Sequence, residues 1–173
     1  LVGGVFLLGA CIAGPLASFV GDLLPVASAD LDPLSVRRVL KNVLVIGMVQ
    51  EMAKYVVVRY SIYNHREFDE PMDGIIYMMA AGIGFATAQN YHHLSSLGET
   101  VVLSQAAMNT VVTTLAHACF AGVLGYALGS AKFSVAPPLS RGASLFLGLC
   151  AAAALNGVFT ALEDRVTLAG VSA

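Results

Sequence analysis

Long uncharged stretches constrain the fold of this chain more than any other feature. Residues 100–131 contain no Asp, Glu, Lys or Arg, and neither do residues 1–21 or 142–162. A helix needs about 20 mostly apolar residues to cross a bilayer. Each stretch is long enough to do so, which indicates a polytopic membrane protein.

The composition excludes the main alternatives. Hydrophobic residues make up 57% of the chain and charged residues only 12%, whereas about a quarter of a soluble domain is charged. An ordinary soluble domain and a disordered chain are therefore excluded. The net charge of -2 leaves no basic surface for a phosphate backbone, so we expect no nucleic-acid partner.

The remaining charges divide the chain into spans. Charged residues gather at 64–71, between two apolar stretches, and the other loops are short. We expect an all-α membrane helix bundle, one domain over residues 1–173, with about five or more transmembrane helices. The expected spans are 1–21, 42–63, 72–91, 100–131 and 142–162. Lys and Arg are divided equally between the two sides, so the positive-inside rule assigns no orientation.

Small residues recur every four positions on two of these spans. Ala80, Gly84 and Ala88 do so on the third, and Gly125 and Gly129 on the fourth. Small residues at this spacing let helix backbones approach closely in lipid. We expect these two spans to be central to the bundle, although the same faces could serve a homo-oligomer.

A few polar residues interrupt the expected spans. A charged side chain at the centre of a membrane helix costs about 2.5–3.5 kcal/mol on insertion scales, so such residues face a bundle interior or a wet cavity. Glu51 and Lys54 lie three residues apart, on one helix face, and we expect them to pair. The other members of this polar set are Gln50, Gln89, Asn90, Asn109, His117 and Asn156.

The polar set fits two kinds of chemistry. A carboxylate, an amine, an imidazole and several carboxamides equip either an intramembrane hydrolase or a proton-coupled transporter. His92 and His93 are adjacent and cannot both face one site well, and metal binding needs three or four convergent ligands. We therefore expect no metal site and no cofactor. A transporter would favour broken spans and inverted repeats, and the sequence contains neither.

Three ordered motifs resemble one family. Residues 50–54, QEMAK, resemble the EExxK motif of the PrsW family of membrane-embedded glutamic proteases. Residues 67–74, EFDEPMDG, resemble the stretch that follows, and residues 82–90, GIGFATAQN, resemble its GxGFAxxEN signature. His117, followed by small residues, resembles the third motif. The resemblance covers residues 40–165 and extends distantly to the CAAX-processing proteases.

The resemblance implies peptide-bond hydrolysis in or at the edge of a prokaryotic plasma membrane. The family's glutamates, at positions 50, 51 and 89 here, would hold and activate a water. His117, with Asn90, would stabilise the oxyanion, and Lys54 and Asn156 would support the site. The implied partners are lipid and a single-span membrane substrate, such as the anti-sigma factors that undergo site-1 cleavage in bacteria.

The sequence departs from the family pattern at the residues that carry its chemistry. Gln50 and Gln89 stand where the family has Glu, and Asn156 stands where the family often has His. A carboxamide has nearly the shape of a carboxylate but cannot accept the proton. We therefore expect the chain to be catalytically inactive as written. An introduced inactivation and a natural pseudoprotease that binds a partner helix would both leave this pattern.

Overall fold

The structure is a computed structural model that describes residues 1–23, 42–96 and 103–171. These residues form helices and, among them, no strand, which confirms the all-α expectation. The first helix runs through α1 (Val2–Leu8), the π-helix η1 (Gly9–Ala13) and α2 (Gly14–Leu23). The others are the π-helix η2 (Asn42–Gly47) leading into α4 (Met48–Ser61), then α5 (Pro71–Ser96), α6 (Leu103–Phe133) and α7 (Pro138–Val171).

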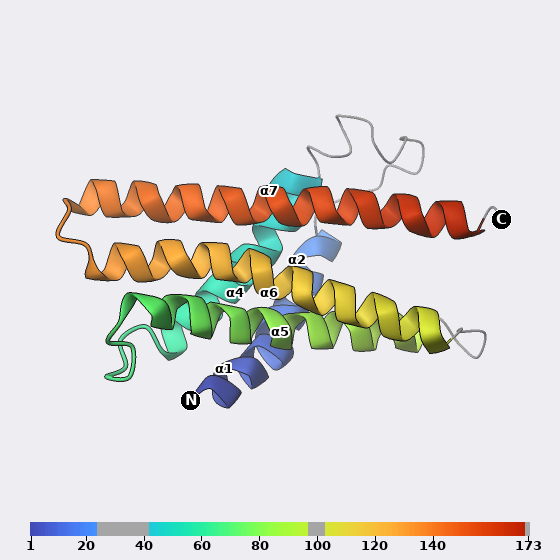
Figure 1. Ribbon diagram of the computed structural model, residues 1–173, viewed down its shortest axis with the longest axis horizontal. Coiled ribbons are helices and arrows are strands. Elements are labelled where there is room, and N and C mark those ends of the chain that lie inside the picture. The colour runs from blue at the N-terminus through green and yellow to red at the C-terminus, as the bar shows by residue number, and fades with distance from the viewer. Residues whose placement is uncertain (24–41, 97–102, 172–173) are drawn as a thin grey trace.

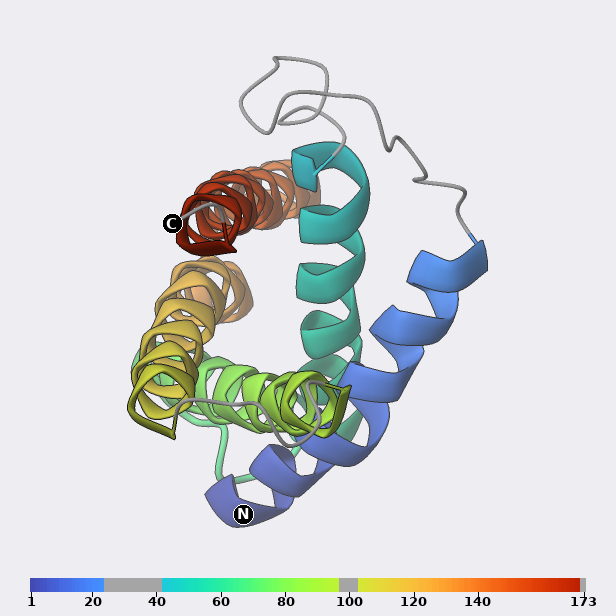
Figure 2. The ribbon, with the colours of Figure 1, turned by 90° about the vertical axis from the view of Figure 1, so that its right-hand side faces the viewer.

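The long helices α5, α6 and α7 lie side by side along the long axis of the molecule (Figure 1). Seen along that axis, α4 and the α1–α2 helix cross them obliquely (Figure 2). This arrangement brings the middle of α4 against α5, α6 and α7.

Three described stretches are long and apolar enough to cross a membrane: Val2–Val20, Ala106–Phe133 and Pro138–Glu163. They match the first, fourth and fifth expected spans, apart from residues 100–102, which lie outside the described part. Among the described residues, η2–α4 and α5 are not long and apolar enough to meet the same criterion for crossing a membrane. α4 contains the charged residues Glu51, Lys54 and Arg59, and its mean hydropathy is correspondingly low.

The α5–α6 contact confirms the predicted close approach of small residues. A side chain at Gly125 would overlap the backbone of Gly74 and come within 2.8 Å of the Cα of Ile75. A side chain at Gly129 would overlap the backbone of Pro71, and one at Gly82 would come within 2.7 Å of the carbonyl oxygen of His117. The two backbones therefore touch along this seam, which fixes the position of His117 relative to α5.

The opposite side of α5 receives the first helix in the same way. Gly9 lies against the backbone of Ala81, and Gly14 lies against Ala88. Gly9 and Gly14 are five residues apart, and the N–H of Gly14 donates to the carbonyl of Gly9 across a π-turn. The wider turn places both glycines on the face that meets α5. Gly84 meets the backbone of Phe6 on the same side, so α5 is central, as expected.

Lys132 ties α6 to the connection between α4 and α5. Lys132 lies in the last turn of α6. Its Nζ donates to the carbonyl oxygens of Tyr63 and Phe68 and lies 4.1 Å from the centre of the Phe68 ring. Tyr63 and Phe68 lie between Ser61, the end of α4, and Pro71, the start of α5, so Lys132 holds the end of α6 against this connection.

Candidate functional site

Close backbone packing brings α4 against α7 at the polar residues. Gly47, the last residue of η2, touches the backbone of Ala153, and a side chain there would overlap its carbonyl oxygen. Gln50 and Glu51 follow Gly47 by one turn, and Asn156 follows Ala153 by one turn. Single π-turns are frequent at functional sites, where they shift the helix face. The glycine contact thus places Gln50 and Glu51 opposite Asn156.

Glu51 and Lys54 form the predicted pair. Lys54 Nζ lies 2.6 Å from Glu51 Oε1, and both side chains are fully buried. Charged residues are almost never fully buried unless they are paired. The pair is therefore the polar centre of the bundle.

Lys54 also contacts two residues of other helices. Its Nζ lies 3.2 Å from Nδ1 of His117 on α6 and 4.7 Å from the centre of the Phe85 ring on α5. The His117 ring is only 6% exposed and stands edge-on to Phe85 and Phe120, with centroids 5.1 and 6.0 Å away. Aromatic side chains and the ammonium together hold the imidazole in one orientation.

Asn156 on α7 joins the two consecutive residues of the α4 motif. Its Nδ2 donates to Gln50 Oε1 at 3.0 Å and to Glu51 Oε1 at 2.8 Å. A carboxamide nitrogen has two hydrogens, so both are used. Asn156 therefore orients the Glu51 carboxylate and has no donor left for a substrate.

Two buried acceptors of the cluster have no hydrogen-bonding partner among the described residues. They are Glu51 Oε2 and Asn156 Oδ1. Nearly all buried polar atoms in proteins have a partner, and those without one call for an explanation. Both belong to residues that already hold the cluster together through their other atoms. These two oxygens are the places where the site can accept a hydrogen bond from a water or a substrate.

The predicted residues of α5 lie further along the bundle. Gln89 is half-buried and follows Phe85 by one turn on the same helix face. Asn90 belongs to a separate network: its Nδ2 donates to the carbonyl of Thr110 and the hydroxyl of Thr114, and its Oδ1 accepts from the Thr113 hydroxyl at 2.8 Å. Asn90 thus links α5 to α6 and is engaged through both ends of its carboxamide.

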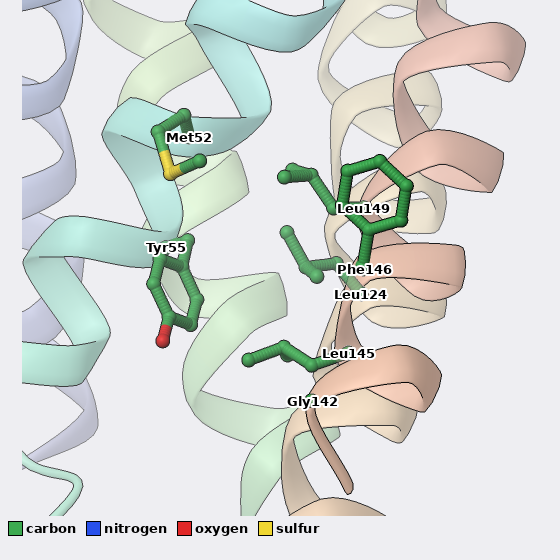
Figure 3. A pocket seen from close by; sticks show the side chains of 7 residues that line it. All are labelled: Met52, Tyr55, Leu124, Gly142, Leu145, Phe146 and Leu149. Carbon is green, nitrogen blue, oxygen red and sulfur yellow. The ribbon is translucent and has the colours of Figure 1, made fainter. Parts of the chain in front are cut away.

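An apolar pocket of about 170 Å³ lies between α4, α6 and α7. Figure 3 shows Met52 and Tyr55 of α4 across from Leu145 and Leu149 of α7. Met52 and Tyr55 directly follow Glu51 and Lys54 in the sequence. Neighbouring faces of α4 therefore carry the ion pair and line the pocket. The remaining lining residues are Leu124, Gly142 and Phe146. Sequence reasoning missed this pocket because its residues look like ordinary lipid-facing positions.

Comparisons with known proteins agree with the motifs. The family described as "PrsW family intramembrane metalloprotease" matches residues 1–171. Proteins named "Protease PrsW" from Geobacillus kaustophilus and Bacillus subtilis are 36% and 31% identical over 89 and 124 residues. These alignments cover 51% and 69% of this chain but only 38% and 54% of the relatives. The chain thus spans about half the length of the curated relatives it matches, or less. No solved structure matches it.

The family description names a metalloprotease, and a metal site needs three or four convergent ligands. Among the described residues, no three His, Cys, Asp or Glu side chains gather in a way that could hold a metal. Glu51 Oε1 and His117 Nδ1 converge, but on the Lys54 ammonium, 2.6 and 3.2 Å away. A metal ion would have to displace that cation. The residues of this cluster therefore do not fit a metal.

Proposed function

This chain belongs to the PrsW family of intramembrane proteases, and from that premise we propose that it is built to cleave single-span membrane proteins. It is an integral membrane protein, and we place it in a prokaryotic plasma membrane. The observation that carries the proposal is the buried cluster around Glu51. Side chains of α4, α6 and α7 meet there through the 2.6 Å ion pair, the 3.2 Å contact of Lys54 with His117 and the two bonds from Asn156.

Glu51 is the general base of the proposed reaction, which would make the protease a glutamic one. Its Oε1 is held by Lys54 and Asn156, whereas its buried Oε2 has no hydrogen-bonding partner in the part of the chain that the structure describes. A water donating to Oε2 would pass its proton to that oxygen as its own oxygen attacks the peptide carbonyl. General-base catalysis needs this kind of hydrogen-bonding reach.

His117 is the donor that we assign to the oxyanion. Asn156 has used both of its N–H groups, and Asn90 is engaged with threonines of α6. His117 is buried beside the ion pair and held between aromatic rings. Fixed donors in a site without bulk water stabilise a developing oxyanion far better than mobile ones.

Gln50 and Gln89 would silence this reaction. By the family resemblance, carboxylates at positions 50 and 89 share with Glu51 the task of holding and activating the water. A carboxamide cannot accept a proton, so we propose that Glu51 alone does not sustain the reaction. Asn156 donates to Gln50 Oε1, and a carboxylate at position 50 can accept the same bond. We therefore expect Gln50→Glu to leave the fold intact.

The substrates that we propose are single-span proteins with short extramembrane stalks, with membrane-spanning anti-sigma factors as the first class to test. A transmembrane segment brings apolar side chains to the site. The apolar pocket lined by Met52 and Tyr55, the residues that follow Glu51 and Lys54 in α4, offers a place for one of the substrate's apolar side chains. The pocket would then select the residue near the cleaved bond.

The test is a cleavage assay on the double variant Gln50→Glu with Gln89→Glu, beside the chain as written. A panel of single-span proteins in detergent serves as substrate, and Glu51→Gln in the double variant is the matched control. We expect cleavage by the double variant only. Cleavage by the chain as written would show that Glu51 suffices and that the two carboxamides do not silence it.

The same assay is run with a chelator present and absent. We expect equal rates, because the Lys54 ammonium already occupies the position between Glu51 and His117 where a metal ion would have to bind. Loss of activity with the chelator, restored by Zn²⁺, would overturn the Glu51 route in favour of metal chemistry.

A second candidate function is a pseudoprotease that holds a partner's transmembrane helix without cleaving it. The hydrogen bond between Asn156 and Gln50 favours it, because the carboxamide at position 50 has a hydrogen-bonding partner without being a carboxylate. Binding of a single-span protein by the double variant without cleavage would support this function. Rapid cleavage would exclude it.

A further inference from the structure

Lys54 is the one fully buried cation of the described residues, and the proposed reaction gives it no proton to move. Its side chain is 0% exposed, as is that of Glu51. Ion pairs of this kind often do no more than offset their own burial. The Lys54 ammonium also contacts His117 and Phe85, which indicates a role beyond pairing with Glu51.

The 2.6 Å contact of Lys54 Nζ with Glu51 Oε1 is that of an ammonium with a carboxylate. With Lys54 charged, its contact with His117 Nδ1 allows only one assignment of donor and acceptor. The two nitrogens lie 3.2 Å apart, within hydrogen-bonding distance. An ammonium has three hydrogens and no lone pair, so it can only donate. His117 Nδ1 must therefore accept, and an imidazole that accepts at Nδ1 is neutral and carries its hydrogen on Nε2.

We infer that Lys54 is a positioning residue that fixes His117 as the neutral Nε2–H tautomer, by occupying the point between Glu51 and His117. The inference rests on the proposed function for its role in catalysis, since it makes His117 a hydrogen-bond donor and leaves Glu51 as the base. The tautomer itself is a property of the folded chain and can be measured without any substrate.

The surroundings of the ammonium support this assignment. Lys54 Nζ lies 4.7 Å from the centroid of the Phe85 ring, which is its third neighbour. The same ring stands edge-on to His117. A buried ammonium with a carboxylate, an imidazole nitrogen and a ring face around it has a partner for each of its hydrogens. Rotating the imidazole would break the contact with Lys54, so one ring orientation is held.

The experiment is nuclear magnetic resonance of the chain as written, labelled with ¹⁵N-histidine, in detergent micelles. The chain has four histidines, and the variant His117→Gln identifies the signals of His117 by their loss. We expect a single tautomer, with hydrogen on Nε2 and with Nδ1 at the frequency of a nitrogen that accepts a hydrogen bond. An imidazolium or an Nδ1–H tautomer would overturn the inference.

The deciding variant is Lys54→Met, which keeps an unbranched side chain, one atom shorter, and removes the three N–H donors. We expect the Nδ1 signal to move to the frequency of a nitrogen without a hydrogen bond, and the Nδ1–H tautomer to appear. Because Glu51 would be stranded, the double variant Lys54→Met with Glu51→Gln provides a second, neutral form. An unchanged Nδ1 signal in either folded variant would overturn the inference.

Two matched variants separate this effect from general disturbance. Lys132→Met removes a lysine that also lies over an aromatic ring but donates to the carbonyls of Tyr63 and Phe68 and not to a histidine. Asn156→Ala removes the other partner of Glu51 Oε1, and the hydrogen bonds of Asn156 within the described residues go to Gln50 and Glu51 and not to His117. Both should leave the His117 signals unchanged, and a change as large as that of Lys54→Met would show that the tautomer is not set by Lys54.

A metal titration completes the test and is independent of cleavage. Co²⁺ added to the chain as written should leave the His117 signals sharp, because Lys54 holds the cation position. Broadening of these signals by one equivalent of Co²⁺ would overturn the inference. Failure of the cleavage assay, by contrast, would overturn the proposed function and leave the tautomer result standing.

Discussion

Two contacts between helices in this chain are built in opposite ways. Along the α5–α6 seam, Gly74, Gly125 and Gly129 bring backbone against backbone and leave no room for a side chain. At the cluster on α4, long polar side chains fill the space, and each needs the others as partners. The seam is sensitive to added volume, whereas the cluster is sensitive to removal of one partner at a time.

Removing one partner of the ion pair should have the largest effect on stability. Lys54→Met leaves the Glu51 carboxylate buried without its cation, which costs about 3–5 kcal/mol in comparable pairs. The double variant Lys54→Met with Glu51→Gln should recover most of this, because it leaves no buried charge. Reversible unfolding in mixed detergents measures both. If the single variant were as stable as the parent, the pairing would not stabilise the fold.

Adding one methyl group to the seam should have the next largest effect. Gly125→Ala places a Cβ against the backbone of Gly74 and Ile75, which cannot give way as a side chain could. Overpacking of this kind costs about 1–3 kcal/mol. The control lies three residues earlier on the same helix: a Cβ at Gly122 meets only side chains, those of the flexible Met79 at 3.4 Å and of Ile75 at 3.9 Å.

Gly122→Ala should therefore be neutral or slightly stabilising, since Ala is favoured over Gly in a helix by about 0.8–1.0 kcal/mol. The difference between the two variants in thermal unfolding isolates the contact from helix propensity. Equal destabilisation by both would mean that the seam is not a backbone contact.

Filling the pocket should have the smallest effect on stability and act on cleavage instead. Gly142 lines the pocket, and a side chain there meets nothing within 4 Å. Gly142→Leu should change the free energy of unfolding by no more than about 0.5 kcal/mol. In the Gln50→Glu, Gln89→Glu variant it should raise KM for a substrate with a large apolar residue.

Gly4→Leu is the matched control for the pocket, because Gly4 also meets open space but lies on α1. It should leave KM unchanged. Equal kinetics for the two leucine variants would remove the pocket from substrate recognition.

Much of this architecture is predictable from sequence because it depends on spacing within one helix. The pairing of Glu51 with Lys54 follows from three residues of separation, and the close approach at Gly125 and Gly129 follows from four. Both contacts are present. Their prediction required no knowledge of how the helices cross.

The partner of each polar side chain on another helix could not be predicted in this way. Asn90 and His117 both lie on helices predicted to be central, yet Asn90 bonds to threonines of α6 while His117 meets Lys54. Which of them reaches α4 depends on how α4 crosses the bundle and on how η2 sets its face. No pattern in one segment contains that information. The catalytic roles of Gln50, Glu51, Gln89 and His117 stay predictions.

The π-turn of the first helix indicates where a homologous chain could lose a residue during evolution without losing its helix contacts. Gly9 and Gly14 both reach α5 although they are five residues apart, because the turn between them holds one residue more than an α-turn. A homologue with one residue fewer here could make the same two contacts from an ordinary helix. Deletion of a single residue between these glycines is therefore an evolutionary step that α1 and α2 can absorb without moving relative to α5.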